Sequence, residues 1–140
     1  MQCVDVNVLV SALRADAPHH DAAYGWLDRA QRGSETVAIL VDVAAAAIRV
    51  LTNARIWPNP SRPRDVLAAL DDLFVSPAVS LIEPPTGRWA TFEALASSMD
   101  LSGNDIPDAL LAASSMTLDA DLVTFDRGFD RFEGLRVARP

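Results

Sequence analysis

Short runs of apolar residues alternate along this chain with longer segments whose apolar residues recur every three to four positions. The short runs are typical of buried strands, and the longer periodicity is typical of helices that cover a sheet. The runs predict strands at the start of residues 2–13 and over residues 36–41, 79–85, 121–126 and 135–140. The periodic segments predict helices within residues 17–33, 42–53, 61–74, 86–100 and 102–120, with a turn or short helix at 127–132.

Strands and helices therefore alternate throughout the chain, without internal repeats or an obvious linker. This order implies a mostly parallel sheet covered by helices on both faces, in a single α/β domain spanning residues 1–140. Local signals refine the helix starts. Asp42 and Ser61 are placed to cap two helices, and Pro63 lies near the first turn of the second.

Composition narrows the class of protein. Half of the 140 residues are hydrophobic and they are spread along the chain, which favours a packed core over disorder. No apolar run approaches the ~20 residues of a membrane span, and the N-terminal residues lack the basic-then-apolar order of a signal peptide. The single cysteine, Cys3, has no partner for an internal disulfide or a zinc site. We expect a cytoplasmic protein.

The charge balance limits the partners. A net charge of −7 argues against nonspecific coating of nucleic acid or of an anionic membrane. It leaves room for a nucleic-acid enzyme whose acidic residues are covered by metal ions. All twelve basic residues are arginines, and the absence of lysine matters because several enzyme classes require one.

Three aspartates far apart in the sequence are predicted to meet. Asp5 ends the apolar start of the first strand, Asp126 ends the strand at 121–126, and Asp108 lies in the first turn of the preceding helix. In an open parallel sheet, sites form outside the carboxyl ends of the strands. Carboxylates at one such edge repel one another unless a cation neutralises them, and ligation by oxygen alone suits Mg²⁺ or Mn²⁺. We therefore expect all three to approach a common cation.

Each of these acids also has a simpler structural interpretation. That interpretation is weakest for Asp5, because a carboxylate at this position interrupts a buried apolar run. Asp108 can favour a helix N-terminus through the helix dipole, and Asp126 can form a turn. Asp105 is placed to cap the helix that contains Asp108, with support of the metal site as a second role. Two further residues, Asn7 and Thr124, are predicted to share a face with Asp5 and Asp126 if the strands persist, where they would orient metal-bound water or satisfy local backbone.

Other conspicuous residues have structural interpretations. His19 and His20 are adjacent, so on a helix they cannot face one target, and we expect both at the surface. Cys3 is expected in the core, and the three tryptophans Trp26, Trp57 and Trp89 are expected to be packing residues. The segment from Arg49 to Arg64 holds four arginines and no acids. It either binds phosphates through bidentate contacts or is a solvated loop.

At these residues the sequence resembles the PIN-domain ribonucleases of the VapC type, toxins of bacterial type II toxin–antitoxin pairs. The matching pieces, in order, are VDVNVLV, IRVLTNARIW, GNDIPDALLAA and LVTFDRGFDRFEGLRV. The resemblance implies a three-layer α/β/α sandwich, cleavage of RNA that depends on Mg²⁺ or Mn²⁺, a homodimer, and inhibition by a VapB-type antitoxin. It carries the family's metal ligands onto Asp5, Asp108 and Asp126.

Two positions depart from the family pattern. Many members have a glutamate three residues before the arginine that matches Arg49, where this chain has Ala46, and many have a second aspartate where it has Gly128. Asp42 is the acid nearest Ala46. It either caps its helix or supports the metal through a shifted helix start or a water, and a third possibility is that Ala46 was introduced to silence a toxic protein.

The residues favour metal-assisted hydrolysis of a phosphodiester, in which the cation lowers the pKa of a bound water and stabilises the leaving oxygen. Receiver domains and haloacid-dehalogenase-like phosphatases also place aspartates at strand ends. Both normally use a lysine, which this chain lacks, and the phosphatases want a second acid where Asn7 stands. The remaining alternative is a catalytically weakened binding module that keeps the antitoxin and RNA interactions, for which Ala46 is the argument.

Overall fold

The computed structural model describes all 140 residues, and its five strands form one sheet in which every neighbouring pair is parallel. The strands are β1 (Gln2–Val4), β2 (Val37–Leu40), β3 (Val79–Ile82), β4 (Asp121–Val123) and β5 (Val137–Ala138). Their order across the sheet is β3-β2-β1-β4-β5. The predicted strands, including the last edge strand, are therefore confirmed.

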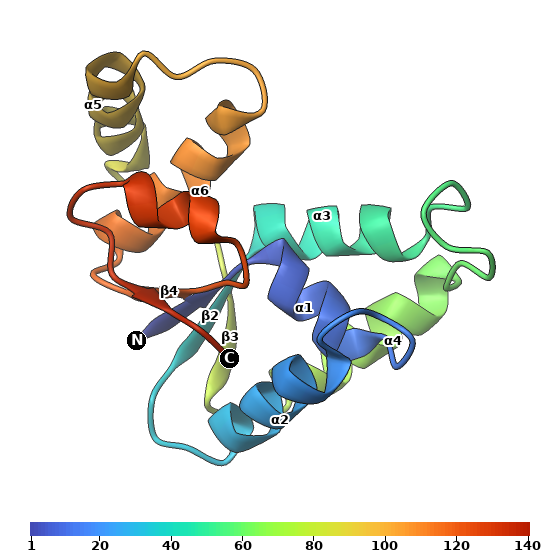
Figure 1. The fold of residues 1–140 in the computed structure, drawn as a ribbon. Coiled ribbons are helices and arrows are strands. Elements are labelled where there is room, and N and C mark those ends of the chain that lie inside the picture. The colour runs from blue at the N-terminus through green and yellow to red at the C-terminus, as the bar shows by residue number, and fades with distance from the viewer.

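Six helices and one short 3₁₀ helix cover this sheet. They are α1 (Val6–Leu13), α2 (His20–Gln31), α3 (Val41–Leu51), α4 (Pro63–Phe74), α5 (Arg88–Met99), α6 (Asp105–Thr117) and η1 (Arg127–Arg131). Helix α1 packs on α2 and α3, α3 on α4, and α5 on α6. Figure 1 shows α1–α4 on one side of the strands and α5 and α6 on the other.

Each side has its own apolar core. The larger one joins α1–α4 to the strands and includes Leu9, Ile39 and Leu51, while the smaller one joins α5, α6 and η1 to β4 and includes Leu122 and Phe132. Two cores separated by one parallel sheet make a three-layer α/β/α sandwich, as the alternation of strands and helices predicted.

The chain order creates a switch point beside β1. Successive strands β1, β2 and β3 run toward one edge of the sheet, and β4 and β5 then lie on the opposite side of β1. Ligands of open α/β sheets bind outside the carboxyl ends of the strands at such a point. Residues that follow β1 and β4 therefore occupy the position where a site is expected.

The start of the chain differs from the sequence-based expectation. Strand β1 ends at Val4, and α1 begins at Val6, so Asn7 lies on a helix rather than on a continued strand. The β-branched residues of this segment favour a strand locally, but Val8, Leu9 and Val10 are buried along α1. Burial in the core outweighs the local preference.

Helix starts were predicted with mixed success. Pro63 is the first residue of α4, as expected, but the capping position is held by Arg62 and not by Ser61. Helix α3 follows β2 without a loop, so Leu40 holds its capping position and Asp42 lies within the first turn. The prediction that Asp42 caps this helix is therefore wrong.

The remaining structural expectations concern burial. Cys3 and Trp26 are buried and Trp57 is partly buried, but Trp89 is 64% exposed, so its assignment as a packing residue is wrong. His19 is exposed, whereas His20 is partly buried and contacts the Ser11 carbonyl oxygen at 2.8 Å. The four arginines between residues 49 and 64 are all exposed. None of the helices has the length and apolar character that crossing a membrane requires.

Candidate active site

Asp5 lies directly after β1 and is 7% exposed. Its backbone N–H continues the ladder to the Val123 carbonyl oxygen at 3.0 Å. Its Oδ2 atom accepts two short hydrogen bonds, each of 2.6 Å, from the Thr124 hydroxyl and from the Asn7 carboxamide. A buried carboxylate held in this way has a fixed orientation at the carboxyl edge of the sheet.

Asn7 links the ends of β1 and β4. Besides its bond to Asp5, its Nδ2 atom donates to Thr124 Oγ1 over 3.1 Å, and its Oδ1 atom accepts from the backbone N–H of Phe125 over 3.2 Å. The first turn of α1 thus brings Asn7 back to the site. The hydrogen-bonding capacity of Asn7 and Thr124 is directed at Asp5 and the neighbouring backbone.

Asp126 follows β4 and caps η1. Its Oδ1 atom accepts from the Gly128 N–H over 2.7 Å, and its own backbone N–H donates to Thr124 Oγ1 over 3.0 Å. Its Oδ2 atom has no hydrogen-bond partner in the protein. Arg139 fixes the same segment by donating to the carbonyl oxygens of Thr124 and Asp126 at 2.9 Å and 3.2 Å. Asp126 therefore both forms a turn and lies at the carboxyl edge of the sheet, as the two interpretations of the sequence predicted.

Asp108 lies in the first turn of α6, as predicted, and is partly exposed. Arg131 of η1 contacts it at 3.5 Å and contacts Asp105 more closely, at 2.9 Å. The capping position of α6 is held by Asn104, so the predicted capping role of Asp105 is wrong. Arg131 partly neutralises this pair of acids.

The three carboxylates influence one another electrostatically. Burial raises the pKa of Asp5, bonds from Thr124 and the Val6 backbone oppose this rise, and the charges of Asp108 and Asp126 add to it. The pKa of Asp108 is also raised, by partial burial and then by Asp126, while Arg131 opposes the shift. Raised pKa values at two neighbouring acids mark a place that a cation would stabilise.

The side chains nevertheless do not form a closed set of ligands. The structure contains no group of three or more His, Cys, Asp or Glu side chains arranged to hold a metal ion. The expected approach of Asp5, Asp108 and Asp126 to one point within ligation distance is therefore absent from these side-chain positions. Their assignment as metal ligands stays a prediction.

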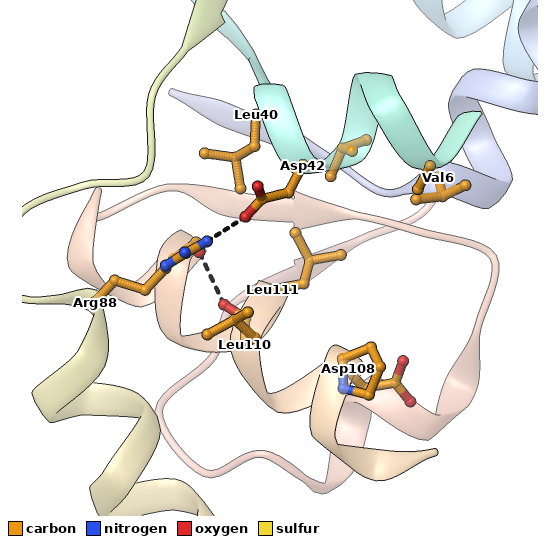
Figure 2. Close-up of a pocket in the computed structure, with 11 residues that line it drawn as sticks. Val6, Leu40, Asp42, Arg88, Asp108, Leu110 and Leu111 are labelled. Atoms are coloured by element: carbon orange, nitrogen blue, oxygen red, sulfur yellow. Dashed lines mark hydrogen bonds and ion pairs between the residues drawn. The ribbon is translucent and has the colours of Figure 1, made fainter. Parts of the chain in front are cut away.

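A pocket of ≈ 220 Å³ lies beside Asp108. Figure 2 shows its charged side chains: Asp42 comes from α3, Arg88 from the start of α5 and Asp108 from α6, against apolar residues that include Leu110 and Leu111. Ala46 also lines this pocket. Ala46, where the sequence resemblance implies an acid, thus lines the same pocket as Asp42 and Asp108.

Asp42 and Arg88 form the principal polar contact of this pocket. Arg88 Nη1 donates to Asp42 Oδ2 over 2.5 Å, and the arginine side chain is only 21% exposed (Figure 2). Asp42 is two residues past the end of β2, just as Asp5 follows the end of β1, so both lie at the same edge of the sheet. Sequence reasoning missed Arg88, because the two residues are 46 positions apart and no local pattern couples them.

Fold and site together define a small α/β/α protein with an acidic site at the carboxyl edge of its sheet. The family model described as the PIN domain matches residues 3–135. A VapC ribonuclease of Mycobacterium bovis is 43% identical over all of this chain and 95% of its own length, and Ribonuclease VapC25 of Mycobacterium tuberculosis is 33% identical over 100% and 99%. The chain therefore belongs to the PIN-domain family, in the VapC branch that these relatives represent.

Solved structures agree with this fold. The structure of VapBC2 from Rickettsia felis, bound to a promoter DNA fragment, matches with a TM-score of 0.74 and 19% identity over 99% of this chain and 98% of that one. VapC20 of Mycobacterium tuberculosis, titled a sarcin–ricin loop cleaving toxin, matches with a TM-score of 0.71 and 15% identity over the full length of both chains. At these identities the likeness supports the architecture alone.

Proposed function

We propose that this chain is an endoribonuclease toxin that hydrolyses RNA phosphodiester bonds with the help of Mg²⁺, for which Mn²⁺ is a possible substitute. The observation that carries the proposal is Asp5, a buried carboxylate held by Thr124 and Asn7 beside the charges of Asp108 and Asp126. The ribonuclease names of the full-length relatives support the same activity.

The donor set suits a hard divalent cation. Asp5, Asp108 and Asp126 offer only carboxylate oxygens, and the pKa values of Asp5 and Asp108 are raised by burial and, to a smaller extent, by neighbouring negative charges. These three residues would hold the ion. When bound, a divalent cation supplies an activated water and stabilises negative charge on phosphate oxygens.

The other residues of the site prepare these carboxylates. Thr124 and Asn7 donate to Asp5 and keep it oriented despite its burial. The Gly128 N–H holds one oxygen of Asp126, which leaves the second oxygen available. Arg131 lies against Asp108 and limits the repulsion between the acids.

A cleavage assay with the purified full-length chain tests the activity. We expect labelled RNA to be cut in Mg²⁺ or Mn²⁺ and to remain intact in EDTA. Asp108→Asn should abolish cleavage while leaving the melting temperature close to that of the parent, because Asp108 is partly exposed. Full cleavage by this variant, or by the parent in EDTA, would contradict the proposal.

The alternative is a catalytically weakened PIN-fold module that retains antitoxin and RNA binding. Ala46 favours it, because it lines the pocket shared by Asp42 and Asp108 but offers no oxygen ligand. Ala46→Glu should tighten divalent-cation binding and raise cleavage if the acid is needed there. RNA binding without cleavage by the parent, with cleavage restored by Ala46→Glu, would support the weakened module.

The proposed partner is a VapB-type antitoxin, and we propose a homodimer acting in the cytoplasm, where its RNA substrate is found. Structural neighbours include a VapBC2 complex with promoter DNA and VapBC-1 of Haemophilus influenzae. Coexpression with the neighbouring antitoxin should suppress toxicity and yield a stable copurifying complex. A chain that is harmless alone and copurifies with nothing would contradict the toxin assignment.

A further inference from the structure

A second pocket, of ≈ 400 Å³, adjoins Asn7. Asn7 lines it, and so do His19, Val50, Trp57 and Phe125. Apart from the His19 imidazole, no ionisable side chain lines it. Its volume falls in the ~300–1,000 Å³ range of small-ligand sites. Three aromatic rings thus line one largely apolar pocket next to Asn7, which donates to the buried Asp5 carboxylate. Phosphodiester cleavage does not itself account for these rings.

The His19 and Phe125 rings form a stacked pair. Their centroids are 4.6 Å apart and their planes differ by 25°. Phe125 lies between Thr124 and Asp126, and its backbone N–H donates to Asn7, so this ring is tied directly to the acidic site. His19 is exposed and has a φ of 65°, a left-handed conformation that costs free energy for a residue other than glycine.

Trp57 forms another wall of the same pocket and is held rigidly. Its indole N–H donates to the Val50 carbonyl oxygen over 3.0 Å, and the Arg14 guanidinium lies over its ring at 4.0 Å from the centroid. Arg14 is itself paired with Asp16 at 2.6 Å. A planar surface fixed before binding loses little conformational entropy when a ligand stacks on it.

Two arginines that neighbour pocket residues in the sequence are available to contact an anionic chain. Arg49 immediately precedes Val50, and Arg55 lies two residues before Trp57; both are exposed and neither forms an ion pair. The segment from Arg49 to Arg64 contains no acidic residue. In single-stranded RNA, unstacked bases bind on aromatic side chains while arginines contact the phosphates.

We propose that this pocket is a nucleobase subsite, in which one unpaired base of the RNA stacks on the aromatic surface formed by His19, Phe125 and Trp57. This inference rests on RNA being the substrate. The base would lie on the Asn7 side of the acidic site, and the adjoining phosphates would face Arg49 and Arg55. The subsite would therefore contribute to RNA affinity and to selection of unpaired RNA.

The test measures binding with cleavage prevented. The full-length protein carrying Asp108→Asn is titrated into a fluorescently labelled single-stranded oligoribonucleotide. A second titration uses a labelled abasic oligomer of the same length. We expect the abasic oligomer to bind about tenfold more weakly. Phe125→Leu and His19→Asn, added to that background, should weaken binding of the normal oligomer and remove the difference between the two oligomers.

Matched variants separate stacking from other effects. Phe125→Tyr keeps an aromatic ring and should keep the affinity, and Trp89→Ala removes an exposed tryptophan outside the pocket and should change nothing. His19→Asn decides the question if Phe125→Leu unfolds, because His19 is exposed and asparagine tolerates positive φ.

The outcomes are distinguishable. Base-dependent binding that these variants abolish supports the subsite, even if the parent chain fails to cleave RNA and the nuclease assignment falls. Unchanged RNA affinity in His19→Asn and Phe125→Leu overturns the subsite but does not contradict the proposed nuclease activity. The subsite is equally overturned if those variants lose antitoxin binding but keep their RNA affinity, or if the chain binds no RNA at all.

Discussion

Thr124 donates a 2.6 Å hydrogen bond to Asp5 across a separation of 119 residues, and this bond is fully buried. It joins the residue after β4 to the residue after β1, on the two sides of the switch point of the sheet. The hydroxyl lowers the pKa of Asp5 against the raising effect of burial. The ionisation of Asp5 therefore depends on a residue from the opposite end of the chain.

Thr124→Val should shift the acid limb of the pH–rate profile to higher pH. The substitution removes the donor, so the pKa of Asp5 rises further and a larger fraction of the carboxyl is protonated at a given pH. Thr124→Ser keeps the hydroxyl and should retain the parent profile. Identical profiles for the valine variant and the parent would show that this bond does not control Asp5.

Asp5→Asn should stabilise the metal-free protein at neutral and alkaline pH. Because the pKa of Asp5 is raised on folding, its contribution to stability is present below its unfolded value near 3.8 and is lost as pH rises through the folded value. Asparagine removes this loss, so the melting temperature of the variant should exceed that of the parent at pH 8 and the difference should shrink toward pH 4. Thermal unfolding in EDTA measures this difference in melting temperature, and a difference that stays constant from pH 4 to pH 8 would contradict the expectation.

Arg88→Gln should strengthen binding of a divalent cation several-fold. The arginine places a positive charge in the pocket that Asp42 and Asp108 share, and its removal makes the local potential more negative. Asp42→Asn should have the opposite effect, because it leaves Arg88 without its partner. Calorimetric titration with Mn²⁺ compares the two; equal affinities would show that the pair lies outside the electrostatic reach of the site.

Gly128→Ala should lower cleavage several-fold with little loss of stability. A Cβ atom at this position would lie 3.0 Å from Asp126 Oδ1, so the carboxylate must move. The backbone N–H group that orients this carboxylate belongs to Gly128 itself, so the substitution acts at the point where the carboxylate is held. Cleavage rates and melting curves of the variant test this, with Gly25→Ala for comparison, because a Cβ atom there meets only the flexible end of the Arg29 side chain, at 3.4 Å.

Cys3 should resist thiol reagents in the folded protein at pH 8. Burial raises its pKa to about 11, a bond with Ser115 opposes this shift, and the charge of Asp5 adds to it. Because the thiolate is the reactive form, labelling should be slow until the chain unfolds. Rapid labelling of the native protein would indicate that the first strand opens readily.

The fold was largely predictable because its signals are local. Buried apolar runs such as residues 36–41 and the helical spacing around Trp26 determine element type within a few positions, and their alternation implies the sandwich. The segment around Asn7 was missed because its β-branched residues favour a strand, whereas the helix they form is stabilised only by packing against α2 and α3. That packing is not visible from the segment alone.

The candidate site divides in the same way. Asp5, Asp108 and Asp126 could be proposed because each follows or begins a predictable element. Contacts between side chains on distant elements could not be predicted, since Arg88 reaches Asp42 from a helix start with no local signature. Asp42 itself was misassigned as a cap because β2 leads into α3 without the intervening loop that a capping aspartate would occupy.

The sheet order has a consequence for biosynthesis. β1 is made first, yet its neighbour β4 and the Thr124 hydroxyl that holds Asp5 arrive only after more than a hundred further residues. A nascent chain therefore carries Asp5 long before the partners that orient it, and a fragment that stops before β4 contains neither Thr124 nor Asp126. Translation that aborts early yields fragments without the site, so any cleavage activity appears late in synthesis, when the cell has already made almost the whole polypeptide.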